Sequence, residues 1–329
     1  MRTTASSGEL RIADNRSRLG VSGYKFVARS TYIFTRIELG TDLGGTVDGL
    51  LLPSDNPPED AGTVFLRVGE VGVSTKWGDF SVGKQWSVYY DVSGYTDRFA
   101  VFGAQGTATY NAGTDGGGGG SGTGRADQAF MYRTHGSSKL TLGLQLQNNG
   151  NIPLADSQKY NGAGGASLSY EFSPEWSAAA AYNHSVIKEL DQELRDLGLT
   201  GDSQAAVLGV QYFHDAIYIA TTFARHKNHE TTNEGKYIDA NGWELYGRYQ
   251  INKRIRAVAG ANYLDPDKND PDAGQYKIRA GILGMQYTYR DIKIGDIIYF
   301  EMELRGGRQV DGARSENAYT LGFRYSFEL

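Results

Sequence analysis

The sequence predicts an all-β protein, a transmembrane barrel of antiparallel strands. In residues 318–329, every second side chain is large and apolar, and the side chains between them are small or polar. A period of two is typical of a strand with one apolar and one polar face. No stretch of the chain has the roughly 20 apolar residues that a membrane helix needs. We therefore expect the apolar faces to contact lipid and the polar faces to contact water.

Similar alternation recurs along the whole chain between turn-rich gaps. In residues 140–147, for example, four leucines alternate with Thr141, Gly143, Gln145 and Gln147. Strands are predicted at 16–24, 32–39, 64–73, 79–86, 125–133, 140–147, 166–172, 176–184, 205–213, 216–225, 243–251, 254–263, 276–289, 294–304 and 318–329.

The composition agrees with a barrel and excludes some other classes of protein. The mean hydropathy is −0.46 and 22% of residues are charged. Lipid-facing and lumen-facing residues cancel in such averages, so these values do not argue against a membrane barrel. The net charge is −5, which gives no basic surface for nucleic acid. The chain has no cysteine, so it forms no disulfide bond.

The gaps between the predicted strands are of two kinds. Those near residues 173–175 and 214–215 are tight turns, and the long polar gaps lie at 148–165, 185–203, 226–241 and 264–274. Short turns on one side and long loops on the other are typical of outer-membrane barrels. Inside one long gap, Val186, Leu190, Leu194 and Leu197 are near helical spacing and predict a short amphipathic helix on the barrel rim.

Two lapses in the alternation need an explanation. Glu70 falls on the outward parity of its strand, so either it is sheltered at a subunit interface or the register differs. In residues 276–289 the apolar positions are even up to Ile282 and odd from Leu283. That change requires either a bulge or a change of environment near Gly281.

A long segment lies between the predicted strands at 79–86 and 125–133. It begins with Tyr89-Tyr90-Asp91-Val92 and ends in a run of glycines from Gly116 to Gly120. A gap of this length in a compact fold is usually functional. Its first part is too rich in aromatic residues to remain exposed. We therefore predict that residues of about 89–124 fold into the barrel and narrow its bore.

These residues resemble those of a known family. Residues 78–84, then 89–92, then Tyr95-Thr96-Asp97 and Phe102-Gly103, are similar to the strand and constriction loop of Gram-negative general-diffusion porins. Residues 16–23 resemble the second strand of that family. Tyr325-Ser326-Phe327 resembles its closing strand.

The resemblance covers most of the chain, which we expect to be a single domain over 1–329. It implies a sixteen-stranded barrel with an inward-folded third loop, assembled as a homotrimer in the outer membrane of a Gram-negative cell. Its surroundings would be outer-membrane lipid and lipopolysaccharide. Its solutes would be ions and small hydrophilic molecules, which diffuse passively through the channel.

The resemblance also implies a pore constriction. Arg18, Arg67 and Arg125 match the arginine ladder on the barrel wall, and Lys84 matches a further wall cation. Asp97 matches a loop carboxylate that faces them. Such an arrangement sets a field across a narrow pore and selects ions. Fixed arginines stay ionised near neutral pH, so we expect a pore that is weakly selective or prefers anions.

The sequence departs from the family pattern in three places. Val101 stands where many members have a second loop carboxylate, which removes acidic charge from the constriction. Leu329 ends the chain where the family usually has Phe, although the apolar parity survives. Residues 1–10 resemble only a stub of the first strand, so the chain is expected to be a mature or trimmed form. An even strand count then requires this stub to pair, or a neighbour to shield the open seam.

The remaining motifs do not favour an enzyme. The cluster His226-Lys227-Asn228-His229-Glu230 lacks the His-Glu-x-x-His order of a zinc protease and is expected to be a solvated loop. Asp265-Pro266-Asp267-Lys268-Asn269-Asp270 lacks the spacing of an EF-hand and is expected to be a surface loop. We therefore expect no catalytic residue, cofactor or metal site. The alternative function is a surface receptor or adhesin whose external loops bind a ligand.

Overall fold

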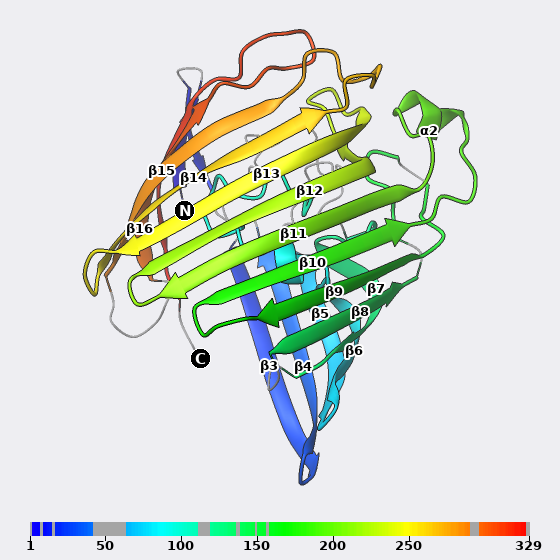
Figure 1. Ribbon diagram of the computed structural model, residues 1–329, viewed down its shortest axis with the longest axis vertical. Coiled ribbons are helices and arrows are strands. Elements are labelled where there is room, and N and C mark those ends of the chain that lie inside the picture. Colours follow the sequence, from blue (N-terminus) through cyan, green and yellow to red (C-terminus); the bar gives the residue numbers. More distant parts are fainter. Residues whose placement is uncertain are drawn as a thin grey trace.

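The protein is described here from a computed structural model, which covers residues 2–6, 9–14, 17–41, 64–110, 119–135, 139–148, 150–155, 158–289 and 296–326. Its strands join in one antiparallel sheet (Figure 1). The strands are β1 (Arg2–Ser6), β2 (Glu9–Ala13), β3 (Ser17–Ala28), β4 (Thr31–Thr41), β5 (Val64–Thr75), β6 (Gly78–Trp86), β7 (Arg125–Arg133), β8 (Leu140–Gln147), β9 (Ala163–Glu171), β10 (Trp176–Ser185), β11 (Ser203–His214), β12 (Ile217–Thr231), β13 (Tyr237–Gln250), β14 (Ile255–Pro266), β15 (Ile278–Thr288), β16 (Ile297–Arg305) and β17 (Ala318–Arg324). The helices are α1 (Tyr90–Ser93) and α2 (Gln192–Asp196).

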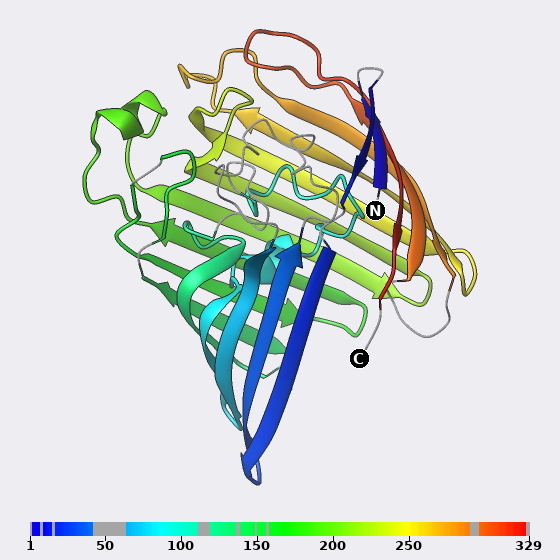
Figure 2. The same cartoon turned by 180° about the vertical axis from the view of Figure 1, so that it is seen from behind.

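Each strand from β3 to β16 pairs antiparallel with the next one along the chain. The beginning of the chain continues the sheet beyond β17, because β1 pairs with β17 and β2 pairs with β1. Of the two alternatives left open for the first ten residues, the structure shows pairing with the sheet, in two short strands, Arg2–Ser6 and Glu9–Ala13. Figure 2 shows the β1–β2 hairpin beside β17.

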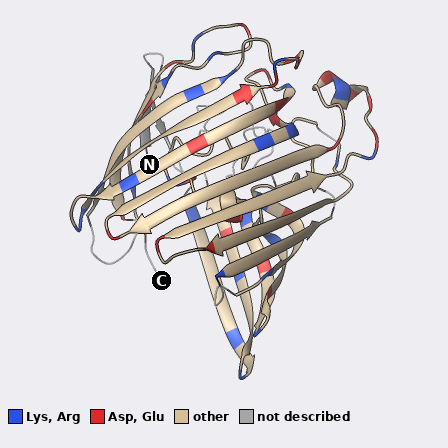
Figure 3. Cartoon of the chain, in the orientation of Figure 1, with Lys and Arg blue, Asp and Glu red and all other residues tan. Residues whose placement is uncertain are grey.

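The predicted alternation places apolar side chains outside and polar side chains inside. In β8, Leu144 and Leu146 are exposed, whereas Gln145 and Gln147 are buried. Figure 3 shows few charged residues along the middle of the strands and many in the loops at one end. Within the described residues, no helix is long and apolar enough to cross a membrane. The final residue, Leu329, lies outside the described part of the chain.

The connections differ in length at the two ends of the strands, as predicted. Two-residue turns at 29–30, 76–77 and 215–216 lie at one end, and the longer loops lie at the other. The predicted loop at 226–241 is wrong, because β12 continues to Thr231 and β13 begins at Tyr237. A register shift between His226 and Glu230 lets this extended pair bend without ending.

The helix predicted in the loop between β10 and β11 is present but shorter than its apolar spacing suggested. Helix α2 has five residues, and the Asp191 side chain caps it by accepting a hydrogen bond from the Leu194 amide at 3.0 Å. Leu194 and Leu199 are buried with residues of the preceding loop and of β13. Val186 lies outside the helix and is 39% exposed. The helix therefore packs the loop between β10 and β11 against the loop between β8 and β9 and against the start of β13.

The structure explains why Glu70 falls on the apparent outward parity. A register shift in the β4–β5 pair places Glu38 opposite Val68 and Leu39 opposite Leu66, which changes the parity of β5. Glu70 consequently faces the same side as Arg36, and the two side chains form an ion pair at 2.7 Å. The register alternative is confirmed, and Glu70 needs no subunit interface to shelter it.

Of the two causes predicted for the change of parity in β15, a bulge or a change of environment, the structure shows the second. The pairings of β15 with β14 and β16 run without a register shift. Ile282 faces inward and is only 1% exposed because a loop packs on it, whereas Leu283 faces outward and is 46% exposed. An apolar residue is stable on the inner face here because it contacts protein instead of water.

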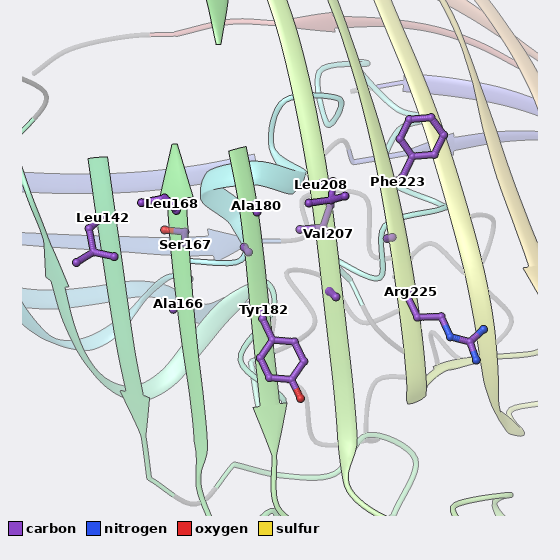
Figure 4. Close-up of a pocket in the computed structure, with 13 residues that line it drawn as sticks. Leu142, Ala166, Ser167, Leu168, Ala180, Tyr182, Val207, Leu208, Phe223 and Arg225 are labelled. Carbon is purple, nitrogen blue, oxygen red and sulfur yellow. The ribbon is translucent and has the colours of Figure 1, made fainter. Parts of the chain in front are cut away.

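A depression of about 510 Å³ lies on the outer surface of β8 to β12. The small residues Ala180 and Ala206 are among those that line it. The larger side chains of Leu208, Phe223 and Tyr182 also line it, and Figure 4 shows them with Ala180. These large side chains belong to the exposed apolar face of the sheet. The depression is therefore part of the surface that meets lipid and does not open into the bore.

Candidate pore constriction

The segment between β6 and β7 lies inside the curled sheet, as the sequence predicts. Its helix α1 contacts β9, β10 and β11, and Tyr89, Val92 and Tyr95 are buried against their inner faces. The inward residues of these strands include Ala179, Ala181 and Ala205. Small side chains leave room for the loop, which would clash with larger residues. We refer to residues 87–124 as the inner loop; residues 111–118 of it are outside the described part of the chain.

Two wall glutamates bind the backbone of the inner loop. The Glu301 carboxylate on β16 accepts hydrogen bonds from the amides of Ala100 at 2.6 Å, Val101 at 2.9 Å and Phe102 at 3.4 Å. The Glu244 carboxylate on β13 accepts them from the amides of Gly106 at 2.7 Å and Thr107 at 3.0 Å, and from the hydroxyl of Thr96 at 2.5 Å. Hydrogen bonds to a charged acceptor are stronger than neutral ones. These two residues therefore hold the middle of the loop against the wall.

A close approach of two backbones supports this attachment. A Cβ atom placed on Gly242 would lie only 1.6 Å from the carbonyl oxygen of Gly106. Glycine at this position of β13 thus lets the loop backbone touch the strand. Any larger residue would push the loop away from the Glu244 carboxylate.

Val101, which the sequence places beside the constriction, packs against the wall. Its side chain is 8% exposed and lies in a buried cluster with Phe102, Ile282, Ile297 and Tyr299. An apolar residue suits this position because it covers the apolar inner face of β15 and β16. The sequence comparison of Val101 with a loop carboxylate did not reveal this packing role.

The histidine cluster is buried, so the prediction of a solvated loop is wrong. His226 and His229 lie on β12 and have no exposed surface. His229 Nδ1 is 2.7 Å from the Ser203 hydroxyl, and its Nε2 is 3.1 Å from the hydroxyl of Thr123. His229 therefore connects the last part of the inner loop to β11. Within the described residues, no group of three or more potential metal ligands lies together.

Two of the arginines assigned to the ladder by resemblance, Arg18 and Arg67, lie beside one carboxylate, that of Glu38. Arg67 is buried, and its Nε donates to Glu38 Oε1 at 2.8 Å. Arg18 Nη1 lies 3.7 Å from the same oxygen, and its side chain is 45% exposed. Glu38 thus lies between two predicted cations and offsets part of their charge.

The other two predicted cations lie near the roots of the inner loop. Lys84 Nζ forms an ion pair with Asp127 Oδ1 at 2.6 Å. Arg125 is 1% exposed, and its guanidinium carbon lies 5.4 Å from the centre of the Trp86 ring. An arginine over an indole ring is stabilised by the ring quadrupole. Arg125 is therefore a buried cation beneath the loop, and Lys84 is the more accessible of the two.

Asp97, the predicted loop carboxylate, is held by two tyrosines. It accepts hydrogen bonds from the hydroxyl groups of Tyr90 at 3.0 Å and Tyr110 at 2.5 Å. Burial raises the pKa of the Tyr90 hydroxyl well above its usual value, and the nearby Asp97 charge adds to the increase. Tyr90 therefore remains a hydrogen-bond donor at neutral pH. The two donors fix the position of the Asp97 carboxylate in the loop.

A second loop carboxylate exists at a position that the sequence reasoning missed. Asp91 Oδ1 lies 3.1 Å from Arg133 Nη2, and Asp91 Oδ2 accepts a hydrogen bond from Ser167 at 2.9 Å. Burial raises the pKa of Asp91, and the adjacent Arg133 opposes that increase. Asp91 links the loop helix to β7 and β9.

Other residues of the site were also missed by the sequence analysis. Inward parity on a predicted strand was the signal available for Glu244 and Glu301, but parity alone does not tell a loop anchor from a wetted side chain. The missed carboxylates are Glu38, Asp91, Asp127, Glu244 and Glu301.

Comparisons with known proteins agree with this architecture. The sequence model of the family described as Gram-negative porin matches residues 2–328. The outer membrane porin PhoE of Klebsiella pneumoniae is 27% identical over 275 residues, which is 82% of this chain and 75% of that protein. The outer membrane porin N of Escherichia coli is 27% identical over 272 residues, which is 65% of this chain and 70% of that protein.

The fold has close neighbours among solved structures. The structure of Salmonella typhi OmpF in complex with daunomycin superposes with a TM-score of 0.76 at 18% identity, and covers 98% of this chain and 95% of that chain. At this level of identity the likeness concerns the fold. Taken with the family match over nearly the whole chain, these findings show that the chain belongs to the Gram-negative porin family, whose members form outer-membrane channels for passive diffusion.

Proposed function

We propose that ions and small hydrophilic solutes pass through a constriction between the inner loop and the wall formed by β3 to β7. The observation that carries the proposal is the attachment of the loop inside the sheet by Glu244 and Glu301. A loop fixed across the bore leaves a narrow aqueous passage beside it. The relatives named above are porins, which favours a channel over a receptor or adhesin. The proposal includes no catalytic step.

The charges at this constriction support weak selectivity with a preference for anions. The cations are Arg18, Arg67, Lys84 and Arg125, and Glu38 and Asp127 on the wall are paired with three of them. Asp97 supplies the carboxylate of the loop. The remaining excess of positive charge is small, so its field favours anions only modestly.

Removing part of the inner loop is expected to raise the single-channel conductance. A deletion of residues 103–120 keeps both roots of the loop and α1, but removes the segment held by Glu244 through Gly106 and Thr107. Conductance grows with the area of the narrowest part of the channel. The measurement is unit conductance in a planar bilayer, with folding checked by the sheet signal in circular dichroism. An unchanged conductance in a folded variant would place the constriction elsewhere.

We further propose that the chain assembles as a homotrimer surrounded by outer-membrane lipid and lipopolysaccharide. The porin family supports this assembly, whereas Glu70, which pairs with Arg36, does not bear on it. The outer face of β3 and β4 carries exposed apolar residues such as Leu19, Val21 and Ile37, which suit either lipid or a neighbouring copy.

The trimer is expected to survive in detergent without heating. Unheated gels should show a species of about three times the mass of the heated chain, because closely packed barrels resist mild detergent. Light scattering with correction for bound detergent gives the mass independently. A monodisperse monomer by that measurement would exclude the trimer.

A further inference from the structure

Three arginines, one in the inner loop and two on the wall, gather away from the predicted ladder. The guanidinium carbon of Arg98, in the inner loop, lies 4.4 Å from the centre of the Tyr218 ring. The guanidinium carbon of Arg248, on β13, lies 5.8 Å from the centre of the same ring. Arg256, on β14, is offset by two residues from Arg248, because Arg248 pairs with Val258 and Gln250 pairs with Arg256. Diagonal neighbours of this kind are within reach of one another in a sheet.

The position of this cluster along the pore is defined by the register of the strands. Tyr218 is the second residue of β12, Arg256 is the second residue of β14, and Arg248 is two residues from the end of β13. All three are therefore close to the short turns at 215–216 and 251–254. Glu244, which anchors the loop, is four residues farther from the turn than Arg248. The two wall arginines, Arg248 and Arg256, thus lie between the Glu244 anchor of the inner loop and the mouth that carries the short turns.

The positive charge of the cluster is not neutralised by neighbouring carboxylates. Among the described residues, Arg98, Arg248 and Arg256 form no ion pair, in contrast to Arg18, Arg67 and Lys84. The Nε atoms of Arg248 and Arg256 are buried and have no hydrogen-bond partner. Arg256 has only a long contact of 3.5 Å from Nη2 to the Thr288 hydroxyl.

Two neighbouring carboxylates are already engaged by other groups. Asp97, next to Arg98 in the chain, accepts hydrogen bonds from the hydroxyl groups of Tyr90 and Tyr110. Glu301, on β16, accepts three backbone hydrogen bonds from residues 100–102. It therefore offsets the field of the cluster from a distance and supplies no direct partner to the guanidinium groups.

We infer that Arg98, Arg248 and Arg256 form a binding subsite for multiply charged oxyanions on the turn side of the constriction. Guanidinium groups present paired N–H donors that match phosphate and carboxylate oxygens. The three guanidinium groups repel one another, and the attraction of each to a bound oxyanion offsets that repulsion. The Gln286 side chain, on the residue that pairs with Arg256, adds a neutral polar group to the same surface. The inference rests on the proposed channel function and names a class of solute for it.

The test uses a double variant, Arg248→Gln with Arg256→Gln, in which two charges are removed and the side chains stay polar. Inorganic pyrophosphate is the probe, added to one side of a planar bilayer at a time while potassium chloride carries the current. In the unmodified channel, pyrophosphate should reduce the current at lower concentration from the side of the short turns than from the side of the long loops. In the double variant the blocking concentration should rise about tenfold or more. Its anion-to-cation permeability ratio should also fall.

A matched control separates this subsite from general surface charge. Lys253→Gln with Arg254→Gln removes the same charge from the turn between β13 and β14, where both residues are exposed. The control should block like the unmodified protein. The subsite would be excluded if pyrophosphate blocked all three proteins at the same concentration, or if both variants lost sensitivity to pyrophosphate by the same factor. If the unmodified protein forms no channel, the proposed function itself fails, and that outcome is distinct from a channel that conducts without pyrophosphate block.

Discussion

Replacing Glu244 and Glu301 together by alanine is expected to convert a steady open channel into one that switches among several conductance levels. The two carboxylates accept hydrogen bonds from five backbone amides of the inner loop. A hydrogen bond contributes about 0.5–1.5 kcal/mol, and more when the acceptor is charged. Loss of all of them leaves the buried amides without partners, so the middle of the loop should leave the wall at measurable frequency.

The experiment is a single-channel recording at fixed voltage, analysed for open-channel noise and for sublevels. Glu244→Gln with Glu301→Gln keeps an acceptor oxygen at each position, and it should produce a smaller increase in noise. Glu175→Ala, in the turn before β10, is the control for loss of a carboxylate elsewhere. A quiet channel of unchanged conductance in the double alanine variant would show that the packing of Phe102 and Tyr89 suffices to hold the loop.

The second large effect is expected from the carboxylates that accompany the arginine ladder. Glu38→Gln with Asp127→Asn leaves Arg18, Arg67 and Lys84 without their wall partners. Two unit charges 8 Å apart in water interact by about 0.5 kcal/mol. Each substitution should therefore favour the anion and disfavour the cation by about a factor of two each, which raises the anion-to-cation permeability ratio roughly fivefold.

Reversal potentials in a potassium chloride gradient measure this ratio directly. Asp311→Asn with Glu316→Gln removes the same charge from the exposed loop between β16 and β17 and should leave the ratio almost unchanged. The wall carboxylates are a better test than Val101→Glu, because Val101 is buried beside Glu301 and a glutamate there would bury a second carboxylate. A shift of equal size in the control would mean that the constriction does not set the selectivity.

Much of the fold was determined by local sequence. The predicted strands at 140–147 and 318–329 match β8 and β17, of which the second ends at Arg324. They were recognised because lipid on one side and water on the other impose a period of two, which needs no knowledge of distant residues. The inner loop was recognised for a similar reason, since an aromatic segment after Trp86 has to be covered. The order of strands followed from the short turns.

The tertiary structure decided the features that depend on cross-strand register. A register shift between β4 and β5 near Leu66 turns Glu70 to the inner face of the sheet. Such a shift depends on how two strands pair, so the alternation within one strand does not reveal it. Residues 226–231 were predicted as loop because polar side chains suggested solvent, yet His229 is buried against the inner loop.

The charges of the pore show most clearly which features follow from the sequence and which depend on the tertiary structure. The sequence supplied Arg18, Arg67 and Lys84 as cations of the wall, and the structure places all three beside carboxylates. Arg248 and Arg256 had no distinguishing pattern, yet they lie together without such partners. A charge is a property of one residue, whereas its neutralisation depends on which residue lies across the next strand. That neighbour is fixed only when the strands are paired in register.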